Sequence, residues 1–456
     1  MKKNLILDTD SYKLSHYKQY PPDTELVFSY IESRGGVFDS TLFFGLQKAL
    51  LDLNKHFPNW DDFAEAKALA IAHGVPFNER GWHDLIELGY FPIEIRAVAE
   101  GSIIPTKNVL VTVVNTDPRF YWLTSYLETS LLRAVWYPTT VATLSFECKK
   151  VIHRYMLATC DTLDGLNFKL HDFGARGVSS EESASIGGAA HLVNFFGTDT
   201  LSGVRFAREY YAAGISGFSI PATEHSTITS WGKEHELEAY RNVLTQFPDG
   251  ILACVSDSYD IFNAVSALWG DLLKSQVLQR DGTLVIRPDS GDPEDILPIL
   301  LSTMGERFGY RENSKGYKVL NDKVRLIQGD GVSLNSIGRI LETMTATGWS
   351  TENIAFGMGG GLLQQLNRDT QKFAMKNSAI RVNGQWRDVY KDPVTDHGKR
   401  SKKGILDLQQ HKTVSISPEL LFAERPNSAL QVVYRNGQLY NKTNFQQVRD
   451  NANKAF

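Results

Sequence analysis

Seven segments of this chain share one pattern, in which a short apolar run ends in polar or glycine-rich residues and a helix-like stretch follows. One is TLVIRPDSGDP, residues 283–293, where Leu284, Val285 and Ile286 predict a buried strand that Arg287 ends. The others contain KLHDFGARG, LVNFFGTDT, GFSIPATEHS, LACVSDSYD, VRLIQGDG and NIAFGMGGG. They recur every ~25–40 residues, the period of a βα unit. The series predicts an α/β fold with a (β/α) barrel, whose functional groups gather on the rim at the C-terminal strand ends.

The sequence on either side of this series differs in character. It predicts helices over 42–57 and 60–72, antiparallel strands within 92–115, and a mostly helical stretch over 121–160 that Pro138 interrupts. Asn436-Gly437 predicts a hairpin turn. We therefore expect three regions: an N-terminal α+β region (1–165), the catalytic barrel (166–384) and a C-terminal β-containing segment (385–456) that packs with the first.

Composition narrows the class of protein. The net charge of −4 gives no global reason to expect binding to nucleic acid or an anionic membrane. The start MKKNLILDTD is too short an apolar stretch for a signal peptide, and no run of ~18 apolar residues could span a bilayer. Cys148, Cys160 and Cys254 are scattered without metal-site spacing, which predicts buried thiols in a reducing compartment. We expect a cytoplasmic protein.

Charged side chains follow the predicted strands. They are Asp199, Asp257, Asp289, Arg176, Arg287 and His225. Any one of the aspartates could instead cap a helix, and a lone histidine is more often structural than catalytic. Glu224 stands beside His225 and could orient or charge it. Ser179 and Glu182 have the spacing of a capping box, so a helix should begin just after HDFGARG.

Two glycine-rich strand ends come last in the barrel series. Gly329 and Asp330 lie in QGDG, and Gly359 and Gly360 lie in GMGGG. Loops after the last strands of a barrel often bind phosphate through backbone N–H groups, although such loops can also be simple tight turns. Arg368, Lys376 and Lys391 follow further along. The rim thus offers cations and N–H groups for two phosphate groups, with carboxylates between them for ribose hydroxyls or Mg²⁺.

Nine motifs carry a specific resemblance. They are DSYKLSHYKQYPP, NTDPRFYWLTSYLET, LHDFGARGVSSEES, VNFFGTDT, ATEHSTITSWGKEHE, VSDSYDI, IRPDSGDP, IQGDGV and NIAFGMGGGLLQQLNRD. In this order they resemble the nicotinamide phosphoribosyltransferases of the type II phosphoribosyltransferase family. The resemblance implies an irregular (β/α) barrel and a homodimer with active sites at the interface. It also implies synthesis of nicotinamide mononucleotide and pyrophosphate from nicotinamide and phosphoribosyl pyrophosphate, in NAD salvage, with ATP as co-substrate and a phosphohistidine intermediate.

The same resemblance implies residue roles. Phe173 would stack on nicotinamide, with Tyr12 of the partner subunit on the other face, and Asp199 would accept from the amide. His225 would be phosphorylated and would contact pyrophosphate with Arg176. Arg287 would bind ligand, and Asp257 and Asp289 would line the ribose and Mg²⁺ region. The ribose and 5-phosphate would be held by Gly329, Asp330, Gly359 and Gly360, together with Arg368, Lys376 and Lys391 from the partner.

Two alternatives stay open. Nicotinate phosphoribosyltransferase would share the fold and mechanism, but Asp199 would repel the carboxylate of nicotinate. A non-catalytic dimeric binding or signalling protein would have no need of intact His225, Arg287 and Asp289. Ala253 aligns where some relatives carry a serine near the amide, so one amide contact differs.

Overall fold

The computed structural model describes residues 3–395 and 400–456. The chain divides into two compact units. The barrel unit comprises residues 144–208 and 214–366, and the sheet unit comprises residues 1–143, 209–213 and 367–456. The divisions fall at 143 and 367 rather than at the expected 165 and 384. One reason is that residues 373–382 form a strand that pairs with residues 24–33 of the sheet unit.

The barrel unit contains a parallel sheet of six strands in the order β7-β6-β13-β12-β9-β8. The strands are β6 (Leu170–Asp172), β7 (Gly197–Thr198), β8 (Asp249–Val255), β9 (Asp281–Arg287), β12 (Val324–Gln328) and β13 (Ile354–Met358). Residues 218–222 join the two edges, because Phe218 bridges Gly197 and Ala222 bridges Ala253, both in parallel. The sheet therefore closes into an irregular barrel with the seven predicted positions in chain order.

Two of the seven positions are less regular than the sequence pattern suggests. In LVNFFGTDT, Leu192 still belongs to a helix and the strand is limited to Gly197–Thr198. Residues 218–222 make isolated bridges and no named strand. Pro221 contributes to this irregularity, because proline has no N–H to donate to a ladder.

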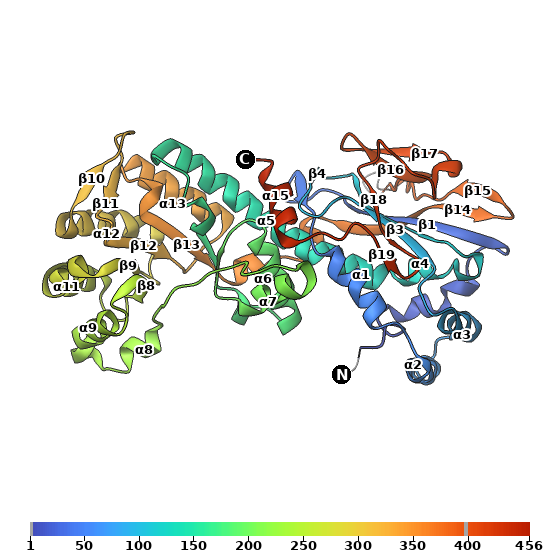
Figure 1. Ribbon diagram of the computed structural model, residues 1–456, viewed down its shortest axis with the longest axis horizontal. Helices are drawn as coiled ribbons and strands as arrows, with labels where there is room; N and C mark the ends of the chain where they lie inside the picture. The colour runs from blue at the N-terminus through green and yellow to red at the C-terminus, as the bar shows by residue number, and fades with distance from the viewer. Residues whose placement is uncertain (1–2, 396–399) are drawn as a thin grey trace. The chain divides into compact units, whose positions relative to one another are not determined.

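Helices follow the strands and surround the barrel (Figure 1). The longer ones are α6 (Glu181–Leu192), α9 (Glu236–Gln246), a π-helix (Ala264–Leu272), α12 (Pro293–Phe308) and α13 (Leu334–Ala346). The shorter ones are α8 (His225–Thr229), α10 (Ile261–Asn263), α11 (Lys274–Gln279) and α14 (Gly360–Leu363), and a small hairpin pairs β10 (Tyr310–Glu312) with β11 (Lys318–Leu320). The cap of α6 lies one residue later than predicted: Ser180, not Ser179, accepts from the backbone N–H of Ser183.

The sheet unit is built on seven strands in the order β15-β14-β1-β5-β3-β18-β19, and every paired neighbour is antiparallel. The strands are β1 (Thr24–Ser33), β3 (Ile93–Ala97), β5 (Val109–Asn115), β14 (Phe373–Val382), β15 (Gln385–Asp388), β18 (Gln431–Arg435) and β19 (Gln438–Leu439). All residues of β3 and β5 are buried, and the charged Glu94 and Arg96 of β3 pair with each other at 2.6 Å. Asn436 and Gly437 both have positive φ, which confirms the predicted hairpin turn.

Helices and short antiparallel strand pairs complete the sheet unit. They are α1 (Leu46–Lys55), α2 (Trp60–Ala72), α3 (Glu79–Leu88), α4 (Leu123–Tyr126), α15 (Phe445–Asn453) and the pairs β2 (Ser40–Leu42) with β4 (Ile103–Pro105) and β16 (Ile405–Gln409) with β17 (Lys412–Ile416). Two further helices, α5 (Glu128–Thr159) and α7 (Leu201–Tyr211), cross the division between the units. The interruption expected at Pro138 is wrong, because α5 continues through it. Its ring fits against Gly45, where a Cβ would come within 2.4 Å of Pro138 Cγ.

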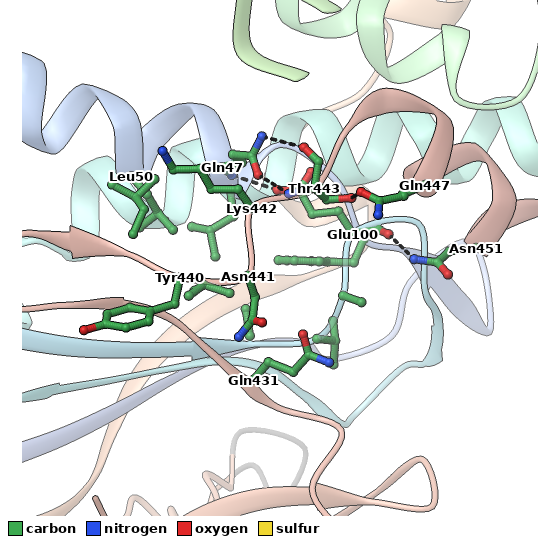
Figure 2. A pocket seen from close by; sticks show the side chains of 17 residues that line it. Gln47, Leu50, Glu100, Gln431, Tyr440, Asn441, Lys442, Thr443, Gln447 and Asn451 are labelled. Carbon is green, nitrogen blue, oxygen red and sulfur yellow. Dashed lines mark hydrogen bonds between the residues drawn. The ribbon is translucent and has the colours of Figure 1, made fainter. Parts of the chain in front are cut away.

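A hollow of about 320 Å³ lies in the sheet unit beside α1, β18, β19 and α15 (Figure 2). Gln47 spans one side of it, donating to the carbonyls of Tyr210 and Thr443 and accepting from the Thr443 N–H. Glu100 accepts from the backbone N–H groups of Gly45 and Gln47 at the start of α1, and from the Tyr211 hydroxyl. These bonds join four segments distant in sequence, so we assign these polar groups to the fold.

Candidate active site on the barrel rim

His225 lies at the first residue of α8, between two carboxylates that follow neighbouring strands. Its Nε2 lies 2.9 Å from Asp257 Oδ1, and its Nδ1 lies 4.0 Å from Asp289 Oδ2. Asp257 is itself fixed, because its Oδ2 accepts from the Asp289 N–H at 3.1 Å and from the Ser290 hydroxyl at 2.6 Å. His225 is thus oriented through Nε2 by Asp257. The sequence neighbour Glu224 does not do this, because its carboxylate caps α8 and accepts from Ser226.

The two carboxylates beside His225 have opposite electrostatic environments. Burial acts to raise the pKa of Asp257, but hydrogen bonds from Ser290 and His225 outweigh burial and lower that pKa. The pKa of Asp289 is raised, chiefly by burial and also by the charges of Asp257 and Asp330, which outweigh the effect of Arg287. A negative charge on Asp289 is therefore less well compensated, and it would be stabilised by a bound cation.

Arg287 connects this histidine site to a second group of residues. Its Nε lies 3.7 Å from Asp289 Oδ1 and has no hydrogen-bond partner within the described residues. Its charge also contributes to lowering the pKa of Asp199. A guanidinium with a donor still unused, between two carboxylates, is suited to bind an oxygen-rich ligand.

Phe173 forms an aromatic surface just after β6. Two glycines make room for its ring: a Cβ on Gly357 would lie 1.9 Å from Phe173 Cε2, and one on Gly329 would lie 3.3 Å from the same atom. A Cβ on Gly329 would also lie 3.4 Å from Asp289 Oδ1. The ring therefore lies against the glycine-rich strand ends and close to the carboxylate row.

Asp199 follows β7 and makes two side-chain hydrogen bonds through one oxygen. Its Oδ1 lies 2.9 Å from His171 Nε2 and also accepts from the Ser219 hydroxyl. Burial acts to raise the pKa of Asp199, but the hydrogen bonds from His171 and Ser219 outweigh it and lower the pKa. The carboxylate is consequently ionised at neutral pH.

The predicted phosphate loops also lie together. A Cβ on Gly177 would lie 3.3 Å from Gly360 Cα, so the exposed Arg176 belongs to a loop that touches the Gly359–Gly360 turn. Asp330 is close enough to Asp289 to affect its pKa, and its carbonyl accepts from Gln328. The structure thus brings eleven of the predicted site residues onto one rim: Phe173, Arg176, Asp199, His225, Asp257, Arg287, Asp289, Gly329, Asp330, Gly359 and Gly360.

The other four predicted residues, Tyr12, Arg368, Lys376 and Lys391, belong to the sheet unit. Tyr12 is exposed on a 3₁₀ helix, Ser11–Lys18, with Lys13 Nζ 5.4 Å from its ring centroid. Desolvation lowers the pKa of Lys376, and although Glu128 opposes this, the charges of Arg34, Lys13 and Arg368 lower it further. These cations form a cluster within the sheet unit. Lys391 makes its backbone bonds with Ser401.

Four contributors to the rim were not predicted: His171, Ser219, Ser290 and Gly357. His171 stands two residues before Phe173, and alternate residues of an extended strand share a face, so this spacing was a usable signal. Ser290 directly follows Asp289, and Gly357 begins the run already singled out. Ser219 had no signal in the sequence, because its contact with Asp199 depends on how residues 218–222 close the barrel.

Two other kinds of feature are absent from the described residues. The described residues contain no group of three or more His, Cys, Asp or Glu side chains placed to hold a metal ion. Among the helices of the described chain, none is long and apolar enough to cross a membrane.

Comparison with solved structures defines the class of fold. The chain superposes over 99% of its length on a nicotinate-nucleotide pyrophosphorylase from Pyrococcus furiosus, with a TM-score of 0.60 at 13% identity. It superposes over 98% of its length on human nicotinic acid phosphoribosyltransferase, with a TM-score of 0.57 at 15% identity. The fold is that of the type II phosphoribosyltransferases, as predicted.

Sequence comparison then gives the family. Residues 168–438 match the model of the nicotinate phosphoribosyltransferase (NAPRTase) family, and residues 4–95 match that of the nicotinamide phosphoribosyltransferase N-terminal domain. A nicotinamide phosphoribosyltransferase of Xanthomonas campestris is 53% identical over 99% of this chain and 98% of its own length. A nicotinamide phosphoribosyltransferase of Acinetobacter baylyi is 33% identical over 96% of this chain and 95% of its own length. The chain belongs to the nicotinate phosphoribosyltransferase family.

Proposed function

We propose that this protein is a nicotinamide phosphoribosyltransferase, a pentosyltransferase of NAD biosynthesis that makes nicotinamide mononucleotide and pyrophosphate from nicotinamide and phosphoribosyl pyrophosphate. The observation that carries the proposal is the connected row on the barrel rim, from Asp199 through Arg287 and Asp289 to His225. It places a possible amide acceptor at one end and phosphate chemistry at the other. The relatives that match almost the whole chain are nicotinamide phosphoribosyltransferases, which supports the same substrates.

In the proposed reaction the ring nitrogen of nicotinamide attacks C1 of the ribose. The new C1–N bond forms as the C1–O bond to pyrophosphate breaks, and the electron pair leaves with pyrophosphate. Phe173 would hold the base by stacking, and Arg287 would stabilise oxygen charge beside the oxocarbenium-like carbon. Arg176 and the turn at Gly359 and Gly360 would bind phosphate oxygens.

We further propose that ATP phosphorylates His225 on Nδ1. Asp257 occupies Nε2, which leaves Nδ1 as the nitrogen able to attack the γ-phosphorus. The N–P bond forms as the bond to ADP breaks. Asp257 would stabilise positive charge on the ring during the transfer, in the way that a carboxylate supports a catalytic histidine. His225→Ala should abolish ATP hydrolysis while some ATP-independent synthesis remains; unchanged hydrolysis would contradict this role.

Mg²⁺ would enter bound to pyrophosphate, whose charge it would neutralise. Asp289 fits this cation, because burial raises its pKa and the like charges of Asp257 and Asp330 add to that effect, so a bound cation would stabilise its ionised form. Asp257 fits less well, since both its oxygens already accept hydrogen bonds. Two carboxylates, Asp289 and Asp330, with phosphate and water oxygens would meet the usual coordination of Mg²⁺ without a third protein ligand.

The cation cluster of the sheet unit leads us to propose a homodimer with shared active sites. Arg368, Lys376 and Lys391 would bind phosphate in the partner's site, and Tyr12 would cover the partner's base. If so, inactive Arg368→Ala protein mixed with inactive Asp289→Ala protein should regain activity on subunit exchange, because some sites escape both lesions. Heterodimers without activity would place all these residues in one site.

Asp199 is the proposed selector of the base. An ionised carboxylate accepts from the amide of nicotinamide but repels the carboxylate of nicotinate, by ~10²–10³-fold in binding after screening. Asp199→Asn should therefore lower nicotinamide efficiency and raise nicotinate use. If the ratio of the two efficiencies does not change, Asp199 is not the selector and Arg287 is the next candidate.

One incubation tests the activity itself. Purified protein is given phosphoribosyl pyrophosphate and Mg²⁺ with either base, with and without ATP, and the mononucleotide is measured. We expect nicotinamide mononucleotide, at a higher rate with ATP. Product from nicotinate alone would favour the nicotinate enzyme, and no product from either base would favour the binding protein.

All three cysteines are free and buried, which supports a cytoplasmic enzyme.

A further inference from the structure

One imidazole contacts both groups proposed to read the base. His171 Nε2 lies 2.9 Å from Asp199 Oδ1, and the His171 ring centroid lies 5.2 Å from that of Phe173, with the planes tilted by 54°. Since an ionised carboxylate accepts hydrogen bonds only, Nε2 must be the donor. The relative position of the stacking ring and the carboxylate thus depends on His171.

The imidazole is itself fixed by packing. The His171 side chain is 14% exposed, and a Cβ on Gly197 would lie 2.6 Å from its Nδ1. Only a glycine at 197 leaves room for the ring in this position. His171 therefore presents its Nε2–H from a constrained site, which reduces the conformational entropy lost in forming the hydrogen bond.

The second oxygen of Asp199 is in a different situation. Oδ1 accepts from both His171 and Ser219, whereas in the described part of the chain no hydrogen-bond donor reaches Oδ2. The Asp199 side chain is 48% exposed, so a small ligand can reach it. The hydrogen bonds through Oδ1 direct the free oxygen, in a carboxylate that would otherwise rotate.

We propose that His171 is a positioning residue for base selection, which holds Asp199 through Oδ1 so that Oδ2 accepts from the amide nitrogen of nicotinamide. This inference rests on the proposed function. It accounts for a histidine on the rim that neither the phosphate chemistry nor the stacking of the base requires. It also assigns discrimination to a pair, Asp199 and His171, instead of one carboxylate.

Two variants that differ by one methylene test this. In His171→Gln the amide nitrogen has the reach of Nε2 and can still donate to Asp199, whereas in His171→Asn it falls short. We expect the ratio of kcat/KM for nicotinamide to kcat/KM for nicotinate to fall about tenfold in His171→Asn, as for a lost hydrogen bond to a charged group. It should stay within about threefold of native in His171→Gln.

A double-mutant cycle separates positioning from a merely structural role. In an Asp199→Asn background, His171→Asn should change the ratio by less than about twofold, because the group it positions has lost its charge. Equal losses in the Gln and Asn variants, an unchanged ratio in His171→Asn, or full additivity with Asp199→Asn would each overturn the proposal. Melting temperatures of all variants identify unfolding, and if His171→Asn does not fold, the cycle is run with His171→Ala.

Binding measurements keep this test apart from the test of function. If the native protein makes no mononucleotide, the proposed function fails. Calorimetric titration with nicotinamide and nicotinate still reports the preference: a native preference for nicotinamide that His171→Asn reduces and His171→Gln retains supports the positioning role. No preference in the native protein, or equal effects of the two variants, overturns it.

Discussion

Charged side chains in the core of the sheet unit and on the rim of the barrel unit have opposite environments. In the sheet unit Glu94 is 2% exposed and accepts from Arg96 and Arg435, both at 2.6 Å. On the barrel rim His225 is 45% exposed, and Arg287 retains an Nε with no hydrogen-bond partner among the described residues. The first set is closed and satisfied, whereas the second combines an exposed imidazole with a buried guanidinium N–H that has no hydrogen-bond partner in the described chain.

The environment of a charged side chain distinguishes a structural charge from a functional one in this molecule. A buried charge is tolerated only when its partners replace water, so a satisfied network belongs to folding. A charge that stays reachable and under-compensated on a rigid strand end has more to gain from a ligand. Substitutions should therefore divide cleanly into those that affect stability and those that affect turnover.

The largest effect should come from Asp407, which is 0% exposed and accepts from Arg425 and Ser428. Asp407→Ala leaves the Arg425 guanidinium buried without its charged partner. We expect the free energy of unfolding to fall by about 3–5 kcal/mol, with kcat/KM unchanged in the protein that remains folded. Urea unfolding and steady-state assays check this, and a loss of activity at full stability would contradict the division.

The converse substitution is Asp289→Asn on the rim. We expect kcat/KM to fall about 10²–10³-fold, as when one charge-stabilising group is removed from an active site, while stability changes by less than about 1 kcal/mol. The matched control is Asp295→Asn, an exposed aspartate early in α12, which should leave both quantities unchanged. Destabilisation comparable to that of Asp407→Ala would make Asp289 a structural charge.

Much of this division was predictable, because the apolar runs and the polar residues after them are properties of sequence. The seven barrel positions and the strand-end placement of Asp199, Asp257 and Arg287 follow from that pattern. The hydrogen-bond partners of the site residues did not follow from the sequence pattern. Glu224 is adjacent to His225 in sequence, yet Asp257, 32 residues away, orients the ring, because closure of the barrel decides which strand ends meet.

Local rules failed where tertiary packing overrode them. Pro138 should interrupt a helix by its missing N–H, but its ring fills the space left by Gly45 and α5 continues. The boundary near 384 was misplaced because pairing of β14 with β1 joins residues more than 300 positions apart, which no local pattern reveals. Similarly, the need for glycine at 357 depends on Phe173, far away in the chain.

A smaller effect should follow from filling that space. In Gly357→Ala the new methyl would displace the Phe173 ring, and we expect KM for nicotinamide to rise about tenfold, as for one lost stacking contact. KM for phosphoribosyl pyrophosphate should stay constant. Gly214→Ala is the control, because nothing lies within 4 Å of its Cβ. Parallel increases in both KM values would show a general distortion of the rim.

The smallest effect is expected at Cys254, which tests whether a residue close to the rim also takes part in the active site. The thiol lies on β8, three residues before Asp257, but it is buried, donates weakly to the Val255 carbonyl at 3.6 Å, and accepts from Thr223. Burial raises the pKa of Cys254 to about 12, so at pH 8 almost no thiolate exists to react. Cys254→Ala should therefore cost about 1 kcal/mol of stability and change kcat/KM by less than about twofold, because the thiol touches no rim group.

Native protein at pH 8 should resist thiol reagents at all three cysteines and react at three after unfolding. Rapid labelling of Cys254 in the native state, slowed by nicotinamide or phosphoribosyl pyrophosphate, would instead place the base of β8 within the reach of ligands and extend the functional region below the rim.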